Sequence, residues 1–254
     1  MSDYVVLKDV EKNFSLNGER IRVLDKISFS LEAGDFLTVL GPSGCGKSTL
    51  IRCICGLEII DGGSVRIDDV EVRGTGPDRI MVFQDFNQLF QWKSVLDNVV
   101  YPLRLTSKHK NKKELVETAE HYLRMVHLND FFNAYPNQLS GGMRQRVAIA
   151  RALAIQPKIL LMDEPFGALD AQTRSILQKE LQEIWQKTKT TIIFITHNIQ
   201  ESIILGNKIL VMSRIPAQIK LFLDNNLDIP RMPETREFMD LWKKLYKNLD
   251  VKRF

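Results

Sequence analysis

The chain has no long hydrophobic run. Its longest apolar stretches, such as residues 159–162 and 191–195, contain four to five residues, whereas a membrane-spanning helix needs about 20. The opening residues, Met1-Ser-Asp-Tyr4, also lack the basic and then apolar order of a secretory signal. We therefore expect neither a membrane span nor a secreted protein.

Cysteine is scarce as well. The three cysteines, Cys45, Cys53 and Cys55, are odd in number and crowd into one short stretch. This is a poor disulfide framework and favours a reducing compartment. We expect the three side chains to be buried as small apolar groups; metal binding by the Cys-x-Cys pair is the weaker alternative.

The chain also lacks a strong charge of either sign. It has 35 Lys and Arg against 31 Asp and Glu, a net charge of +4, which does not indicate a nucleic-acid partner. One basic cluster covers residues 108–113. We interpret it as a solvated loop that leads into a helix over residues 113–126, with a phosphate-binding patch as the alternative.

What the chain does contain is the pattern of an α/β protein. Its composition, 44% apolar and 26% charged, is that of a folded chain and excludes general disorder. Residues 86–155 are mostly helical in pattern, so we expect an α/β core interrupted by a helical insertion. The predicted strands cover residues 5–10, 21–31, 35–40, 80–83, 158–162, 191–195, 209–212 and 218–222. The predicted helices cover residues 47–55, 113–126, 140–154 and 171–187, and a further helix follows residue 235.

A glycine-rich loop follows the buried strand at residues 35–40. The segment Gly41-Pro-Ser-Gly-Cys-Gly-Lys-Ser48 fits the pattern G-x-x-x-x-G-K-[ST] and opens a helix. In this context backbone N–H groups turn toward a phosphate, Lys47 adds positive charge, and the Ser48 hydroxyl ligates Mg²⁺. A glycine-rich turn that matches by chance is the alternative. The predicted phosphate-binding residues are Gly41, Pro42, Ser43, Gly44, Cys45, Gly46, Lys47, Ser48 and Thr49.

Two carboxylates end a second buried strand. Asp163 and Glu164 follow four apolar residues, at the carboxyl end of a strand where open α/β sheets place their sites. Asp163 is suited to holding Mg²⁺, and Glu164 to accepting the proton of an attacking water. Without the glycine-rich loop, the pair would be read as the start of a solvated loop.

A third motif, Leu139-Ser-Gly-Gly-Met-Arg-Gln145, opens another helix. A serine and two glycines at a helix N-terminus offer a hydroxyl and free N–H groups to an anion. The helix that begins at Lys47 already offers its N-terminus to one phosphate. We therefore expect this second helix N-terminus to bind a second nucleotide across an interface. A simple N-cap after Pro136 is the alternative.

With these motifs the chain resembles the ATPase subunits of ABC transporters over residues 4 to 215. The resemblance implies roles for further residues. Gln84 is similar to the glutamine that senses the metal and the γ-phosphate, and His197 to the switch histidine. Residues 168–170 resemble the loop that follows the catalytic carboxylate, and Phe14 resembles the aromatic residue that stacks on adenine; a core role is the alternative for Phe14 and for His197. The residues expected to contact the second copy's nucleotide are Ser140, Gly141, Gly142 and Gln145.

The resemblance also implies an architecture and partners. We expect a P-loop NTPase core of the RecA-like type with an antiparallel β subdomain and the helical insertion, spanning residues 1–225, and a helical tail at 226–254 packed on it. The family works with ATP and Mg²⁺ as a head-to-tail dimer, whose other member is a second copy or a paralogous ATPase subunit. Members of the family bind integral membrane permease subunits, and they are linked to a solute-binding protein only indirectly, through the permease. The resemblance therefore implies that the chain lies peripherally at the cytoplasmic face of the cell membrane. An apolar cluster beside Gln84, made of Phe86, Leu89, Phe90 and Trp92, is a candidate docking patch for the permease; a core role is the alternative.

Three segments point to a subgroup of importers. Residues 76–79, 92–98 and 163–174 are similar to those of importer subunits for nitrate, alkanesulfonates and taurine. The chain departs from that subgroup at Asn198, where aspartate is usual, and at residues 206–208 and 214–217. An importer of another solute class remains the alternative, and a non-transport ABC ATPase is the weaker one. The chain has neither the Asn-Lys-x-Asp sequence of a GTPase nor the long heptad repeats of a DNA-repair ATPase.

Overall fold

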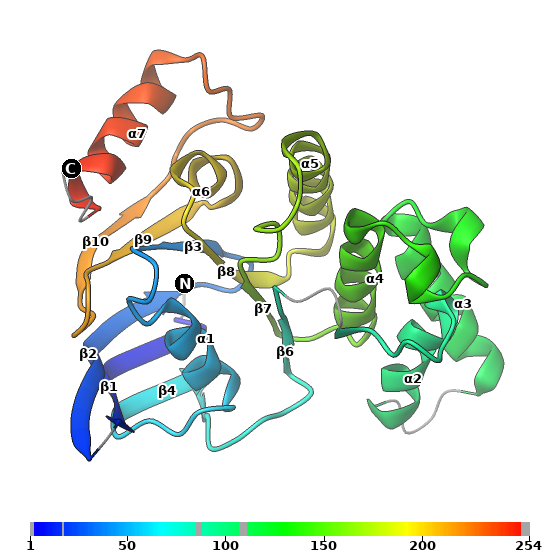
Figure 1. The fold of residues 1–254 in the computed structure, drawn as a ribbon, viewed down its shortest axis with the longest axis horizontal. Helices are drawn as coiled ribbons and strands as arrows, with labels where there is room; N and C mark the ends of the chain where they lie inside the picture. Colours follow the sequence, from blue (N-terminus) through cyan, green and yellow to red (C-terminus); the bar gives the residue numbers. More distant parts are fainter. Residues whose placement is uncertain (1–2, 17, 85–87, 107–110, 250–254) are drawn as a thin grey trace. The chain divides into compact units, whose positions relative to one another are not determined.

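The structure is a computed structural model that describes residues 3–16, 18–84, 88–106 and 111–249. The chain forms two compact units (Figure 1). The first unit joins Met1–Gly76 to Lys189–Phe254, and the second consists of Pro77–Thr188. No helix in the described part of the chain is long and apolar enough to cross a membrane.

An antiparallel sheet begins the first unit. Its strands lie in the order β2-β1-β4-β5, and they are β1 (Val5–Leu16), β2 (Glu19–Leu31), β4 (Gly62–Ile67) and β5 (Val70–Glu71). The register of β1 shifts near Asp9, whose φ angle is 46°. Two further register shifts follow, between Val10 and Lys12 and between Lys12 and Asn13, so this part of β1 is irregular.

The second set of strands in this unit carries the glycine-rich loop. β3 (Phe36–Leu40) pairs in parallel with β8 (Thr191–Thr196) and with β9 (Lys208–Met212), and β10 (Ile219–Asp224) is antiparallel to β9. All five residues of β3 are buried, as its continuous apolar run predicts for a strand covered on both faces.

Three helices complete the first unit: α1 (Lys47–Cys55), α6 (Ile199–Leu205) and α7 (Arg236–Asn248). In α7, Phe238 and Leu245 are buried in a cluster with residues of α6 and β9, and the helix lies beside α6 (Figure 1). Full burial of two such side chains stabilises the tail by about 1.5–3 kcal/mol each. The C-terminal stripe thus packs on the chain's own core.

The second unit combines a strand pair with helices. β6 (Arg79–Val82) pairs in parallel with β7 (Ile159–Asp163). The helices are α2 (Val95–Thr106), α3 (Lys112–Met125), α4 (Gly141–Ala154) and α5 (Ala171–Thr188), with 3₁₀ turns at Asn129–Phe131 and Pro136–Gln138. Helices α2, α3 and α4 pack on one another. The predicted helical segment 86–155 falls inside this unit, while residues 108–110 of the basic cluster lie outside the described residues.

The three cysteines are buried, and none forms a disulfide within the part of the chain that the structure describes. Burial raises the pKa of the Cys53 thiol to about 12, so this thiol stays protonated and unreactive at neutral pH. The apolar role predicted for the cysteines is confirmed.

Candidate nucleotide site

The glycine-rich loop connects β3 to the N-terminus of α1. Gly46 precedes the helix with a φ angle of 104°, a conformation that glycine adopts without strain. A Cβ atom on Gly46 would lie 2.9 Å from Val23 Cγ1, and one on Gly41 would lie 2.7 Å from Cys45 Sγ. Backbone conformation and packing therefore both require glycine here, and the loop is held close against β2.

Lys47 is folded into this loop. Its side chain is buried, and its Nζ atom donates to the carbonyl oxygens of Gly41, at 3.0 Å, and of Pro42, at 3.1 Å. These bonds fix a positive charge inside the turn of the backbone. That is where a phosphate bound by the loop amides would need it.

A cavity of about 410 Å³ opens beside the tip of the loop. Its lining residues are Pro42, Ser43, Gly44, Cys45, Arg214 and Ile215. Ser43, Gly44 and Arg214 are exposed, so the outer side of the loop is open to a ligand or to another molecule, with a guanidinium group in its wall.

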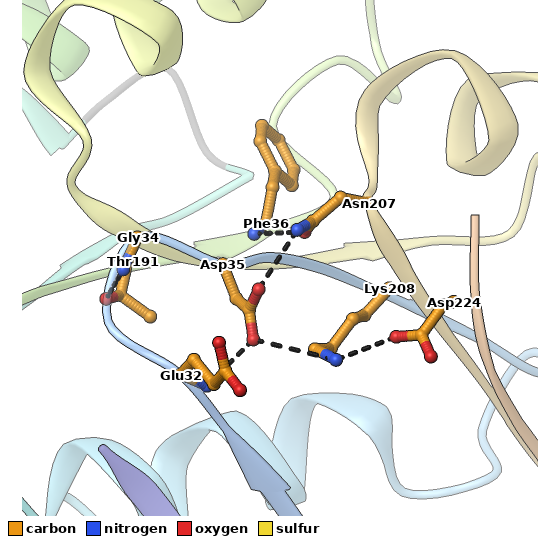
Figure 2. Close-up of polar contacts among 8 residues, drawn as sticks. All are labelled: Glu32, Gly34, Asp35, Phe36, Thr191, Asn207, Lys208 and Asp224. Atoms are coloured by element: carbon orange, nitrogen blue, oxygen red, sulfur yellow. Dashed lines mark hydrogen bonds and ion pairs between the residues drawn. The ribbon is translucent and has the colours of Figure 1, made fainter. Parts of the chain in front are cut away.

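A polar network anchors β3 at its other end (Figure 2). The Asp35 carboxylate accepts hydrogen bonds from the Glu32 backbone N–H, at 2.8 Å, and from the Asn207 Nδ2 atom, at 2.9 Å. The Asn207 Oδ1 atom accepts in turn from the Phe36 N–H at 2.7 Å. Asn207 thus ties the start of β3 to the start of β9, and it does so with both atoms of its amide.

Lys208 extends this network. Its ammonium lies 2.7 Å from the Asp224 carboxylate and 3.9 Å from that of Asp35. The hydrogen bond to Asp224 is the main reason that the pKa of Lys208 is raised. Residues 206–208, which depart from the importer pattern, therefore have partners of their own and hold the strand that delivers the phosphate loop.

Phe14 lies near the end of β1, paired with Ile21 of β2. Its side chain is 38% exposed, although phenylalanine is among the residue types most often buried. An exposed aromatic ring in the unit that carries the phosphate loop is available for stacking.

His197 follows β8 at an exposed position, in a turn that is fixed by side chains. The buried Thr196 hydroxyl donates to the Glu201 carboxylate and accepts from the Asn198 N–H at 3.0 Å. Asn198 is the N-cap of α6, and its Oδ1 atom accepts from the Glu201 N–H at 3.1 Å. A carbonyl oxygen of asparagine caps a helix as well as a carboxylate oxygen does, so the departure at Asn198 keeps the turn intact.

In the second unit the two carboxylates stand at the end of β7. Asp163 is the last residue of the strand, and Glu164 has a φ angle of 44°. This left-handed backbone is costly for a residue other than glycine, and such outliers gather at functional sites. The Gly167 N–H donates to the Glu164 carbonyl oxygen at 3.0 Å, which closes the turn.

Gln84 reaches the same turn. Its Nε2 atom would lie 3.1 Å from a Cβ atom on Gly167, whose other near neighbour is the Glu164 carbonyl oxygen. The structure therefore places Gln84 at the turn that contains Glu164, although the two residues are 80 positions apart in the sequence. Within the second unit, the Gln84 amide oxygen and the Asp163 carboxylate are oxygen donors, the kind that Mg²⁺ prefers when phosphates complete its shell.

The third motif forms the start of α4. Ser140 is the N-cap, and its Oγ atom accepts from the Met143 N–H at 3.3 Å. A Cβ atom on Gly142 would lie 2.6 Å from Thr173 Cγ2 of α5, so glycine is needed where the two helices approach. Ser140 is exposed and Gly141 half-buried, so this helix end is accessible.

Gln145, in contrast, is fully buried. Neither atom of its amide has a hydrogen-bond partner among the described residues. Its side chain thus does not present itself to a nucleotide at the surface in this structure, unlike Ser140 and Gly141. This observation weighs against the direct contact that we predicted for it.

The apolar residues after Gln84 divide into buried and exposed members. Leu89 is buried, Trp92 is 75% exposed, and the Phe90 ring lies 5.6 Å from that of Trp92 and 5.2 Å from that of Tyr101, centroid to centroid. Phe86 lies outside the described residues. A cavity of about 370 Å³ with an apolar wall adjoins Phe90 and Tyr101, and Arg151 also lines it.

Two positioning residues were not predicted from the sequence. Glu201 is identifiable in retrospect as the third residue of a helix capped by Asn198, the spacing of a capping box. Asn98 is fully buried in α2, accepts from the Phe90 N–H at 2.8 Å and donates to three backbone carbonyl oxygens, including that of Phe90. The hydrogen-bond partners of Asn98 lie in an irregular segment, so no pattern in the sequence predicts its role.

Comparison with known proteins identifies similar chains. The family model described as ABC transporter matches residues 24–167. An uncharacterized ABC transporter ATP-binding protein of Methanocaldococcus jannaschii is 47% identical, over 94% of this chain and 88% of the relative. An aliphatic sulfonates import ATP-binding protein of Bacillus cereus is 43% identical, over 97% and 96%. A nitrate import ATP-binding protein of Synechocystis is 43% identical, over 88% and 83%.

A solved structure agrees with this result. The dimeric post-hydrolysis state of an ATP-binding cassette, bound to ADP and Pi, superposes with a TM-score of 0.77 at 31% identity, covering 88% of this chain and all of the other. The agreement confirms the P-loop α/β fold predicted from the sequence.

Proposed function

The chain belongs to the ABC transporter family, and we propose that it is the ATP-hydrolysing subunit of an importer for a small oxyanion such as a sulfonate or nitrate. The family assignment and the full-length similarity to import ATP-binding subunits support ATP hydrolysis coupled to import. The solute class rests on the names of two relatives and on the subgroup segments at residues 76–79, 92–98 and 163–174.

The observation that carries the proposal is the position of Lys47. Its buried ammonium is held inside a turn of backbone at the start of α1, beside an open cavity. A helix N-terminus and a fixed cation at one point form a binding site for the β- and γ-phosphates of ATP. Ser48 would hold Mg²⁺ with Asp163 and Gln84, and the metal, when bound, neutralises phosphate charge and fixes the triphosphate geometry.

Hydrolysis then proceeds by positioning and electrostatics. Glu164 accepts a proton from a water molecule, whose oxygen bonds to the γ-phosphorus while the bond to the β,γ-bridging oxygen breaks. ADP and phosphate are released. His197 and Gln84 hold the γ-phosphate and the water in line. The strained backbone of Glu164 and the Gln84–Gly167 contact support a preorganised turn for this step.

A second copy completes each site in this proposal. The accessible N-terminus of α4, with Ser140, Gly141 and Gly142, would close over the nucleotide held by the loop of the other copy. The dimeric cassette bound to ADP and Pi supports this arrangement. Closure would exclude water from the site and so strengthen each electrostatic contact within it.

The surface around Phe90 is the proposed contact with the membrane subunits. The exposed Trp92 and the apolar cavity beside Phe90 and Tyr101 offer a docking place for an apolar segment of a permease loop. The same segment follows Gln84, so nucleotide-dependent movement of that glutamine would reach the permease. The chain would then lie peripherally at the cytoplasmic face of the membrane, with a solute-binding protein on the other side.

The substitution Glu164→Gln tests the catalytic assignment. The variant keeps the shape of the turn and removes the proton acceptor, so we expect ATP to bind normally and turnover to fall by at least about 100-fold. ATP should convert the variant to a stable dimer in size-exclusion chromatography. The matched control is Glu183→Gln, an exposed position on α5. Normal hydrolysis by Glu164→Gln would reject the assignment.

A further inference from the structure

The environment of Phe14 contains a cation that the proposed mechanism does not use. Lys12 lies two residues earlier on β1, and its Nζ atom is 4.9 Å from the centroid of the Phe14 ring. The residue is only 9% exposed, although lysine is seldom buried without a partner. A nearly buried cation against an aromatic ring calls for a physical explanation.

The Lys12 ammonium is held by two groups from the segment that follows α1. It donates to the Ile59 carbonyl oxygen at 2.7 Å and lies 3.4 Å from the Glu58 carboxylate. These partners satisfy much of its hydrogen-bonding capacity, so its place over the ring is set by the fold rather than by chance rotation of a long side chain.

The same segment clamps the neighbouring residue of β1. The Asp61 carboxylate accepts from the backbone N–H of Asn13 at 2.5 Å and from its Nδ2 atom at 3.1 Å. The Asp61 N–H donates to the Glu11 carbonyl oxygen at 2.8 Å. The backbone beside Phe14 is thereby fixed to the segment that follows α1, the helix that begins at Lys47.

Strand pairing connects this cluster to the phosphate loop by a second route. Lys12 pairs with Leu24 of β2, and a Cβ atom on Gly46 would lie 3.3 Å from Leu24 Cδ2. The loop therefore packs against the rung of the sheet that pairs with Lys12. A nucleotide with its phosphates at the loop would extend its base toward this side of β1.

We propose that Lys12 is a positioning residue that fixes the Phe14 ring as the platform for the adenine of ATP. The ammonium lies over one face of the ring, and in the proposal the base stacks on the other. Holding the ring in one orientation before binding reduces the entropy lost on stacking, and the cation–π contact supplies that restraint. This inference rests on the proposed ATP site. It adds that Lys12 contributes to binding of the adenine base without contacting the phosphates.

The test compares ATP with inorganic tripolyphosphate, which shares the phosphate groups and has no base. For Lys12→Met, which keeps the length of the side chain and removes its charge, we expect ATP affinity to fall about three- to tenfold and tripolyphosphate affinity to stay within about twofold. The KM for ATP should rise while kcat at saturation is kept. Lys12→Arg, which keeps a cation above the ring, should recover most of the ATP affinity.

An unchanged ratio of ATP to tripolyphosphate affinity in Lys12→Met would overturn the inference. If both affinities fall equally, the ratio is unchanged and Lys12 has a general structural role; if neither falls, Lys12 has no role in binding. Should Lys12→Met not fold, Lys12→Gln, which keeps a donor for Ile59, decides the matter by the same ratio. Melting temperatures without ligand establish folding.

The variant Phe14→Ala separates this inference from the proposed function. It should lose at least as much of the ATP preference as Lys12→Met does. If the unsubstituted protein binds neither ligand, the proposed function fails. If it prefers ATP and Phe14→Ala keeps that preference, the base lies elsewhere; the roles of Lys12 and Phe14 are then refuted while the proposed function stands.

Discussion

A Cβ atom on Gly167 would lie 3.1 Å from the Nε2 atom of Gln84. This separation is shorter than ordinary van der Waals contact, so Gly167→Ala must displace the glutamine by a few tenths of an ångström. We expect kcat to fall about three- to thirtyfold, since small errors in position are costly in catalysis, and the Kd for ATP to stay unchanged. Steady-state hydrolysis and equilibrium binding measure the two quantities.

Gly74→Ala is the matched control for that variant. A Cβ atom at Gly74 meets no atom of the described residues within 4 Å, so the same added methyl group should leave kcat unchanged. Equal activity of Gly167→Ala and the unsubstituted protein would contradict a role for Gln84 at the reacting phosphate.

Lys47→Ala should abolish tight nucleotide binding. The substitution removes the ammonium that donates to the carbonyl oxygens of Gly41 and Pro42, and charge-assisted bonds to phosphate are among the strongest in proteins. We expect the Kd of a fluorescent ATP analogue to rise at least about 30-fold while the melting temperature without nucleotide shifts little. Lys179→Ala, at an exposed position on α5, should bind normally; tight binding by Lys47→Ala would be incompatible with the site.

Asn207→Asp should destabilise the first unit. In the variant a carboxylate oxygen replaces the Nδ2 atom that lies 2.9 Å from the nearly buried Asp35 carboxylate. Loss of a donor to a buried charge, with repulsion added, costs about 1–3 kcal/mol. Urea unfolding at pH 7 measures the change, and Asn133→Asp, at an exposed position, serves as control. Equal unfolding free energies for the two variants would argue against the network in Figure 2.

Asp61 should make the clamp on β1 sensitive to acid. The hydrogen bond from the Asn13 backbone is the main cause that holds the pKa of Asp61 below its ordinary value of 3.8. A carboxylate with a lowered pKa contributes stability above the unfolded-state value and loses it as the pH falls through the folded-state value. The stability advantage over Asp61→Ala should be constant from pH 7 to about 5 and shrink below 3.8. Urea unfolding along this pH series would count against the clamp if the advantage grew on acidification.

Much of the fold could be predicted because its elements carry local signals. The strand Phe36–Leu40 is a continuous apolar run, and the helix Lys47–Cys55 is bounded by Gly46 and Gly56. The C-terminal helix has its apolar residues on one stripe. In each case the residues that define the element are neighbours in the sequence, so pattern alone suffices.

Other features depend on contacts between distant residues. Helix α6 is only seven residues long, and α2 contains Pro102, so neither has a strong helical pattern. The burial of Gln145 and the approach of Gln84 to Gly167 arise from packing between elements. Lys12 and Phe14 are only two positions apart in the sequence, but their contact depends on Ile59 and Glu58, which hold the ammonium at the ring.

The central claim is that each of two copies closes the nucleotide site of the other, and crosslinking tests it most directly. One copy carries Ser43→Cys, at the exposed tip of the phosphate loop, and the other carries Gly141→Cys, at the start of α4; both also carry Glu164→Gln to stop turnover. The native cysteines are buried, and each single variant alone is the control. We predict an inter-subunit disulfide that forms rapidly with ATP and slowly without it. Failure of the two positions to crosslink in the presence of ATP, when the same preparation binds ATP, would contradict the account.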